Sequence, residues 1–522
     1  MSKNSLKKLQ TIIRRLTPDE RSILESYLTG FQSQYGKYES KYLQLYREIS
    51  DISKEPDEEE IRKKVSPDVS LDAFQKTAAR LKDKIFDSLL LDFNIFRKGS
   101  YSKPTQISYK LRKQFIQVQI LHTRGLTDEA KEILEKGYKE CCSYYYYQEA
   151  VSYLQLLYTI ENRGGKLKRV QALEAELQHV RALRNITEKS ELYFSSIGFR
   201  EYYQGNPETY ISELRFKIAD LESEPKLKSS VLAYYYYLYL KVFYHKAKKE
   251  YSHMEFHARE ILHVLLQNPN LQSKPRIING YLLLTDANVY NGEHAQALGY
   301  IDRSLKELIP GNKNYSAILL HKCMIMLYAG QTSEAQTVIE SLLRQADNSR
   351  VTDAVSYNKL LYYKAIVHLL QGDAAAAYKV MRQVTSFHQD KEGWNINVRI
   401  LQIMIMIENE YLDEADQEIE NFRKTLSNII KSQPVSKRNI LIFRLLTWLS
   451  KKDFDFGRVY KDHAKLIGLL FSDDPELRWD FLTPEVMPFH SWFKLKADKN
   501  KIDHDKLYIM PPVKVLDPIS ES

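Results

Sequence analysis

Residues 278–310 read INGYLLLTDANVYNGEHAQALGYIDRSLKELIP, and this stretch carries the pattern that predicts the fold. An apolar helical segment leads to a turn at Gly292, and a second segment follows with Ala297, Ile301 and Ser304 at helical spacing. Glycine favours the left-handed conformation that ends a helix, and the polar residue after it caps the next helix. Because the fifth residue after the turn is small, two helices can approach closely there. The stretch therefore predicts a helical hairpin.

The same small residue recurs about every forty positions, which is the signature of a stacked-repeat protein. The positions that hold alanine are Ala130, Ala297, Ala335, Ala377 and Ala415, and the last four are separated by 38, 42 and 38 residues. Weaker positions at Val170, Tyr210, Met254 and Arg458 extend the series. We expect these residues to pack between helices, in about nine helical pairs over residues 106–471.

The composition favours helix throughout, because only 18 of the 522 residues are Gly and 16 are Pro. We predict an all-α protein, a right-handed α-solenoid of helical hairpins with an N-terminal helical domain. We expect three parts. They are a helical capping domain at residues 1–103, the repeat array at residues 104–471, and a C-terminal tail rich in Pro and aromatic residues at 472–522 that packs on the last repeat.

The turn-plus-alanine pattern resembles the tetratricopeptide repeat. Residues 278–310 match best, with Tyr281 and Leu284 in the first helix, Gly292 in the turn and Ala297 in the second helix. The period is about four to ten residues longer than that family's compact unit, which implies longer helices or connections. The whole chain is similar to uncharacterised bacterial repeat proteins with a helical N-terminal segment. The resemblance implies a binding architecture and leaves its ligand open.

In such an array, the first helix of each pair lines a concave face on which a peptide can lie. Relatives that bind chaperone tails place Lys and Asn there to hold a terminal carboxylate. The corresponding positions here are Leu282, Asp286, Leu320, Met324, Tyr362, Ile366, Ile400 and Met404. This mainly apolar lining suits an apolar helix or the protein's own tail. The alternative is that these side chains only pack between helices, as apolar stripes usually do.

The N-terminal segment supports a second interpretation. Helices expected at 57–65 and 70–92 flank a turn with Pro67, which suits a helix-turn-helix. The residues that would face phosphates are Lys76, Arg80, Lys82 and Lys84. The alternative is a solvated basic face on a capping domain, because charge runs are usually solvated. The net charge of +9 permits nucleic-acid binding without requiring it.

The sequence contains no GxxxxGK[ST], no GxGxxG that opens a helix and no GxSxG, so it offers no phosphate loop or nucleophile elbow. His253 and His257 lie one turn apart on an expected helix, near Glu260 and His245, and two such histidines can bind zinc. We favour solvated or core histidines here. We therefore expect no enzyme activity, no cofactor and no metal.

Three cysteines, Cys141, Cys142 and Cys323, cannot form a disulfide framework and indicate reduced thiols in a cytoplasmic protein. No apolar run approaches the ~20 residues of a membrane-spanning helix.

Together these features predict a non-enzymatic scaffold that binds a protein or peptide on its concave face. The alternative is a regulator whose N-terminal domain binds nucleic acid while the repeats sense a protein or peptide. A hydrolase or metalloenzyme centred on His253 and His257 is the third hypothesis. The expected partner is a protein or peptide, with nucleic acid as the alternative and no membrane. The sequence identifies neither the ligand nor the oligomeric state.

Overall fold

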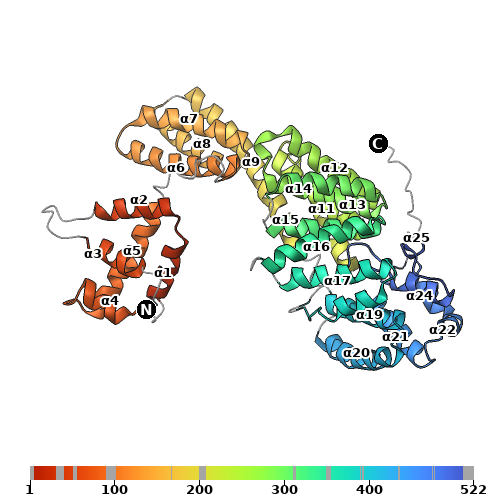
Figure 1. Ribbon diagram of the computed structural model, residues 1–522. Helices are drawn as coiled ribbons and strands as arrows, with labels where there is room; N and C mark the ends of the chain where they lie inside the picture. Colours follow the sequence, from red (N-terminus) through yellow and green to blue (C-terminus); the bar gives the residue numbers. More distant parts are fainter. Residues whose placement is uncertain are drawn as a thin grey trace. The chain divides into compact units, whose positions relative to one another are not determined.

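A computed structural model describes the chain at residues 5–30, 40–50, 56–89, 101–165, 167–198, 207–309, 313–348, 354–387, 390, 393–432, 435–472, 474 and 476–508. In these ranges all regular secondary structure is helical, which confirms the all-α prediction (Figure 1). The chain divides into two compact units, Met1–Lys113 and Gln114–Ser522, so the division falls inside helix α6 (Lys103–Thr123). The boundaries expected after residues 103 and 471 stay predictions.

Among the described residues, five helices build the core of the first unit, and the first part of α6 follows them. They are α1 (Ser5–Arg15), α2 (Pro18–Thr29), α3 (Lys41–Ser50), α4 (Glu58–Val65) and α5 (Leu71–Leu89). Helix α5 packs against α1, α2 and α3, and α4 packs against α3. At the start of α2, the Glu20 amide donates to Thr17 Oγ1 at 3.2 Å and the Thr17 amide donates to the Glu20 carboxylate at 2.6 Å. This is a capping box. Residues 90–92 of the expected helix 70–92 lie outside the described residues.

The second unit is a series of antiparallel helices in which neighbours in sequence pack against each other. After α6, the helices are α7 (Thr127–Ser143), α8 (Tyr147–Arg163), α9 (Leu167–Gly198), α10 (Pro207–Glu222), α11 (Val231–Ala247), α12 (Tyr251–Gln267), α13 (Lys274–Tyr290), α14 (His294–Lys306), α15 (Lys313–Tyr328), α16 (Thr332–Asn348), α17 (Ala354–Leu370), α18 (Ala374–Met381), α19 (Trp394–Glu408), α20 (Leu412–Ser432), α21 (Lys437–Ser450) and α22 (Phe456–Asp462). Three short helices follow: α23 (Ala464–Leu469), α24 (Phe489–Ala497) and α25 (His504–Leu507). The pairs from α11–α12 to α21–α22 form the stacked hairpins of an α-solenoid.

The small residues of the repeat lie where helices meet. Ala130, Ala297, Ala335, Ala377 and Ala415 have no exposed surface. Of the weaker positions, Val170 and Met254 are buried and Tyr210 is half-buried. Arg458 is exposed, and its neighbour Val459 is fully buried in its place. The extrapolation to Arg458 was therefore wrong by one residue, because Asp455 caps α22 and accepts a hydrogen bond from the Arg458 amide at 2.9 Å.

Helix α9 departs from the expected alternation of short helices. It runs for 32 residues without a break and packs against both α8 and α11. One helix therefore serves two neighbouring pairs.

The turns inside the hairpins share one backbone geometry. Gly292, Gly330 and Gly372 have φ between 73° and 79°. The amide after each glycine donates to a carbonyl five residues earlier, as from Glu293 to Asn288 at 2.8 Å. This bond defines the Schellman motif, and the positive φ explains why glycine marked these turns in the sequence.

Five further described turns have the same bond without glycine, at Tyr145, Lys249, Glu410, Asp453 and Lys499. Tyr145, Lys249 and Glu410 take the left-handed position with φ of 63°, 60° and 61°. The amide of Tyr411 donates to the Met406 carbonyl at 2.9 Å, five residues back. The glycine signal therefore misses these turns, although their geometry is the same.

We expect Glu410→Gly to stabilise the protein by about 0.5–1 kcal/mol, because a residue with a Cβ is strained in the left-handed region. The Glu410 side chain is exposed, so little packing is lost. Thermal unfolding followed by circular dichroism measures the change. Glu410→Ala retains the Cβ and is expected to leave the melting temperature unchanged. A lower melting temperature for Glu410→Gly would contradict the strain argument.

Among the described residues, no helix combines the length and apolar character needed to span a membrane.

Candidate functional site

The residues predicted to line the concave face differ in exposure along the array. Leu282, Asp286 and Leu320, on α13 and α15, are half-buried. The residues further along the chain are buried: Met324 at 7% exposure, Tyr362 at 2%, Ile366 at 0%, Ile400 at 2% and Met404 at 1%. The predicted groove is therefore accessible at α13 and at part of α15, and closed at α17 and α19.

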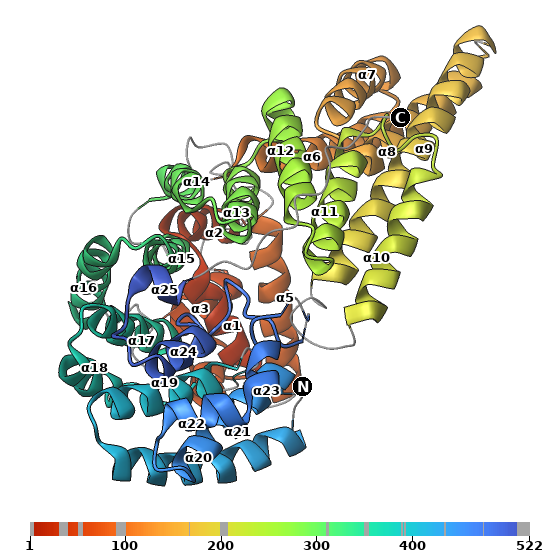
Figure 2. The same cartoon turned by 90° about the vertical axis from the view of Figure 1, so that its right-hand side faces the viewer.

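Residues 476–508, here called the C-terminal segment, contact the closed part. The Tyr362 hydroxyl donates to the Pro484 carbonyl at 3.0 Å. Trp492 Nε1 donates to the Glu408 carboxylate at 2.7 Å. Figure 2 shows α24 and α25 within the curve of the surrounding helix pairs. The segment therefore covers the inner side of α17 and the end of α19.

The C-terminal segment also reaches much earlier helices. Arg478 donates to the Tyr251 hydroxyl at 3.1 Å, at the start of α12. His504 Nε2 donates to the Leu327 carbonyl at 2.8 Å, at the end of α15. The aromatic residues and prolines of the tail predict packing on the last repeat. The described part of the tail contacts six hairpins, from α11–α12 to α21–α22.

Aromatic side chains anchor this segment. Phe489, Trp492 and Phe493 have no exposed surface, and Trp479 is 4% exposed. They belong to the same continuous core as the helices from α11 to α22. Burial of each such side chain contributes about 1.5–3 kcal/mol. The segment is therefore an integral part of the second unit.

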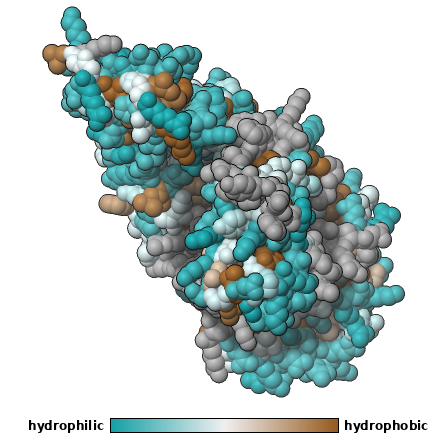
Figure 3. All heavy atoms as spheres, turned by 90° about the vertical axis from the view of Figure 1, so that its left-hand side faces the viewer, coloured by the Kyte–Doolittle hydropathy of each residue, from teal (hydrophilic) through white to brown (hydrophobic). Residues whose placement is uncertain are grey.

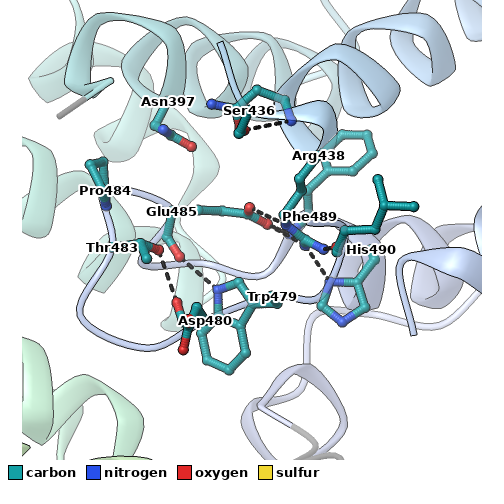
Figure 4. A network of polar contacts seen from close by, with 12 residues as sticks. Asn397, Ser436, Arg438, Trp479, Asp480, Thr483, Pro484, Glu485, Phe489 and His490 are labelled. Carbon is teal, nitrogen blue, oxygen red and sulfur yellow. Dashed lines mark hydrogen bonds and ion pairs between the residues drawn. The ribbon is translucent and has the colours of Figure 1, made fainter. Parts of the chain in front are cut away.

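An ion pair fastens the segment to α21 (Figure 4). Arg438 Nε and Nη2 donate to the two Glu485 carboxylate oxygens at 2.6 and 2.7 Å. The guanidinium also donates to the Leu477 carbonyl at 2.6 Å and to His490 Nδ1 at 2.8 Å. The Phe489 amide donates to Glu485 Oε1 at 2.9 Å. Because both charged side chains are only 7% exposed, this bidentate pair lies in a low-dielectric interior.

The His490 ring makes the docking of the segment sensitive to pH. Burial, reinforced by Arg438, holds the pKa of His490 well below 6.5. The folded protein therefore keeps the ring neutral, while the unfolded chain binds a proton below about pH 6.5. The stability linked to His490 is complete above that pH. It falls by about 1.4 kcal/mol per pH unit as the pH decreases further.

We expect the urea midpoint of the intact chain to fall between pH 6.5 and 5, and His490→Gln to reduce that dependence. Burial also lowers the pKa of His294 and His321, so part of the dependence persists in the variant. The measurement is the difference between the two pH profiles. Parallel profiles would show that His490 does not contribute.

The accessible part of the inner face combines apolar and polar groups. Asp286 Oδ1 lies 3.5 Å from His321 Nε2, and each side chain is 23% exposed. Burial lowers the pKa of His321, Asp286 opposes this shift, and Lys246 adds to it. Leu282 and Leu320 are half-buried on the same two helices as this pair. We call Leu282, Asp286, Leu320 and His321 the open inner face.

The basic residues predicted to contact nucleic acid lie on α5, interleaved with acids. Lys76 pairs with Asp72 at 2.9 Å. Lys82 lies over the Phe86 ring and Lys84 over the Tyr42 ring, at 5.5 and 4.9 Å from the centroids. Arg80 is exposed, as are Asp83 and Asp87. This surface carries both signs of charge. Nucleic-acid binding stays a prediction.

Figure 3 shows a mainly hydrophilic face on which hydrophobic residues form small separate groups. Large contiguous hydrophobic patches mark protein-binding surfaces. The described residues on this face form no such patch.

The cysteines are free, and Cys141 and Cys323 are fully buried. Burial raises the pKa of Cys141 and raises that of Cys323 to about 12. Buried thiols with raised pKa values are unreactive.

No family model and no curated protein matches this chain. Among solved structures, it is similar to the crystal structure of a signal transduction ATPase with numerous domains (STAND) from Pyrococcus horikoshii that has a tetratricopeptide repeat sensor. The sequences are 10% identical and the TM-score is 0.38. The match covers 81% of this chain and spans 66% of the length of that protein. The helical-repeat architecture follows from this chain's own helices and turns.

Proposed function

We propose that this protein is a non-enzymatic scaffold that binds a protein or peptide on its open inner face. The observation that carries the proposal is the change in exposure along the array. Leu282 and Leu320 remain accessible, whereas the equivalent positions Tyr362 and Ile400 are buried. The C-terminal segment occupies the closed part, so a ligand has access to α13 and α15.

The chemistry of the open inner face indicates the kind of ligand. Leu282 and Leu320 offer apolar surface to one side chain or two. The carboxylate of Asp286 accepts hydrogen bonds, and the imidazole of His321 is neutral, with one donor and one acceptor nitrogen. An amphipathic peptide segment satisfies both features. Apolar anchors would supply affinity, and the polar pair would fix the register.

A cytoplasmic location without cofactor or catalytic activity is part of this proposal. Its support is the three free cysteines, which suit a reducing compartment, and the missing catalytic and phosphate-binding motifs.

The test is affinity capture of the intact protein from lysate of its own host, with and without nuclease, read by mass spectrometry. The site variant is the double substitution Leu282→Asp and Leu320→Asp. The matched control is Leu266→Asp, which changes an exposed leucine on α12. Circular dichroism confirms that both variants keep the helical fold.

We expect a protein partner that resists nuclease, binds the control variant and is lost from the double variant. A partner retained by the double variant would place binding elsewhere on the chain. Capture that depends on nucleic acid would instead favour the N-terminal regulator hypothesis and contradict the scaffold.

A further inference from the structure

Three histidines and a glutamate meet at the turn between α11 and α12. His245 lies in the last turn of α11, Glu250 immediately precedes α12, and His253 and His257 lie in its first two turns. Lys249 takes the left-handed conformation with φ of 60°, and the Glu250 amide donates to the His245 carbonyl at 2.8 Å. The backbone of the turn therefore folds Glu250 back onto His245.

The side chains lie within reach of one ion. His245 Nδ1 is 2.7 Å from Glu250 Oε2. Potential ligand atoms of His245, Glu250 and His253 all lie within 4.8 Å of one another. The rings of His245 and His253 are nearly parallel, with centroids 5.0 Å apart. Tetrahedral zinc holds its ligands at about 2.0–2.2 Å. Small side-chain rotations would therefore bring all three ligand atoms to this distance from one metal ion.

One nitrogen of this cluster lacks a protein partner. His253 Nδ1 is buried and makes no hydrogen bond among the described residues. An unsatisfied buried polar atom costs about 1–3 kcal/mol. A metal ion at the centre of the cluster would satisfy a buried imidazole nitrogen together with the neighbouring ligands.

The surroundings of the cluster resemble the outer shell of a metal site. His257 stacks on His245 with centroids 5.3 Å apart, and its Nδ1 is 2.8 Å from Glu260 Oε2. The Glu260 contact holds the His257 ring against the ring of the proposed ligand His245. The Tyr234 hydroxyl donates to the other Glu260 oxygen at 3.4 Å. The cluster is therefore held from both helices.

Burial distinguishes these side chains from free solvated histidines. The side chains of His245 and His257 are each 13% exposed, and Glu250 is 21% exposed. Lys248 pairs with Glu250 Oε1, which leaves Oε2 beside His245.

We propose that His245, Glu250 and His253 bind a divalent transition metal of the zinc class, with water in the fourth position. The two imidazoles and one carboxylate match the ligand types of zinc and its neighbours. The metal would join the end of α11 to the start of α12. The sequence already placed His245 near His253 and His257, and Glu250 supplies the carboxylate in place of Glu260; no metal was expected there.

Zinc binding by the intact, untagged chain tests this assignment. The protein is treated with a chelator, then dialysed against Zn²⁺ for metal analysis and against Co²⁺ for absorption spectroscopy. We expect one equivalent of bound zinc, a Co²⁺ spectrum of low coordination number, and a higher melting temperature with metal. Less than stoichiometric zinc at micromolar concentration would overturn the proposal.

Three variants locate the site. His253→Ala should weaken zinc binding by more than the ~100-fold that loss of an outer-shell partner produces. Glu250→Gln preserves the shape of the side chain and removes a charged ligand, so it should also bind weakly, even if His253→Ala folds poorly. His263→Ala, which changes an exposed histidine on the same helix, should bind like the parent protein. Equal binding by Glu250→Gln and the parent would overturn the assignment.

Discussion

Arg438→Met is expected to loosen the C-terminal segment where it contacts α21. The substitution preserves much of the apolar side-chain volume but leaves the Glu485 carboxylate buried without its cation. Breaking a buried ion pair from one side costs about 3–5 kcal/mol. The Leu477 carbonyl and His490 lose their donor as well. The buried anchors Trp479, Phe489, Trp492 and Phe493 each contribute about 1.5–3 kcal/mol and together exceed this loss, so the segment should open more often around Glu485 without detaching.

Limited proteolysis and tryptophan fluorescence measure this opening. We expect faster cleavage within residues 476–508 and a red-shifted emission, because Trp479 and Trp492 lie in the segment and are buried in the parent protein. The double variant Arg438→Met with Glu485→Leu removes both charges and should restore much of the protection. If Arg438→Met is as resistant as the parent, the ion pair does not hold the segment.

Ala377→Arg is expected to destabilise the second unit by about 4 kcal/mol or more, since it adds both volume and an unpaired charge to a full core. Ala377 has no exposed surface and lies on α18, which packs against α17 and α19. The repeat lets one hairpin contact only its neighbours, so unfolding should begin at α17–α19.

Residues 374–377 are all alanine, so the chain supplies its own control. Ala375 is exposed on the same helix, and Ala375→Arg is expected to leave the melting temperature nearly unchanged. Thermal unfolding of both variants by circular dichroism makes the comparison. If Ala377→Arg has the same melting temperature as the parent protein, the recurring alanines do not mark the contacts between helices.

Local backbone chemistry explains which parts of the fold could be predicted from the sequence. Gly292, Gly330 and Gly372 identified turns because glycine takes positive φ without strain. Lys249 and Glu410 form the same turn with ordinary side chains, and such turns leave no mark in the sequence. The repeat period of about forty residues still locates these units, because it does not depend on glycine in the turn.

The misplaced Arg458 and the unbroken helix α9 show the limits of a fixed period. The cap at Asp455 sets the register of α22 locally, and it moves the buried position to Val459. The repeat period predicts two helices and a turn where α9 runs for 32 residues as one helix. The period gives only the average spacing of the repeats, whereas local caps and turns determine the residue at which each helix begins.

Which positions of the inner face are accessible could not be predicted, because their burial depends on contacts between residues far apart in the sequence. Tyr362 bonds to a residue 122 positions later, and Arg438 to one 47 positions later. The aromatic residues between prolines indicated an ordered tail on the last repeat, but not that it reaches back to α12. Helical spacing likewise identified His253 and His257 as neighbours. The contact of Glu250 with His245 depends on the left-handed turn at Lys249, which the sequence does not reveal.

The position of the C-terminal segment sets an order of events during synthesis on the ribosome. The Tyr362 side chain on α17 and the end of α19 at Glu408 emerge long before the C-terminal residues that contact them. At about 5–20 residues per second, roughly 100 residues from Met404 to Tyr508 take some 5–20 s to translate. During that interval the nascent array exposes an apolar surface that the finished protein hides. Chaperones therefore have a defined window in which to bind this chain, and a premature stop before Trp479 would make that exposure permanent.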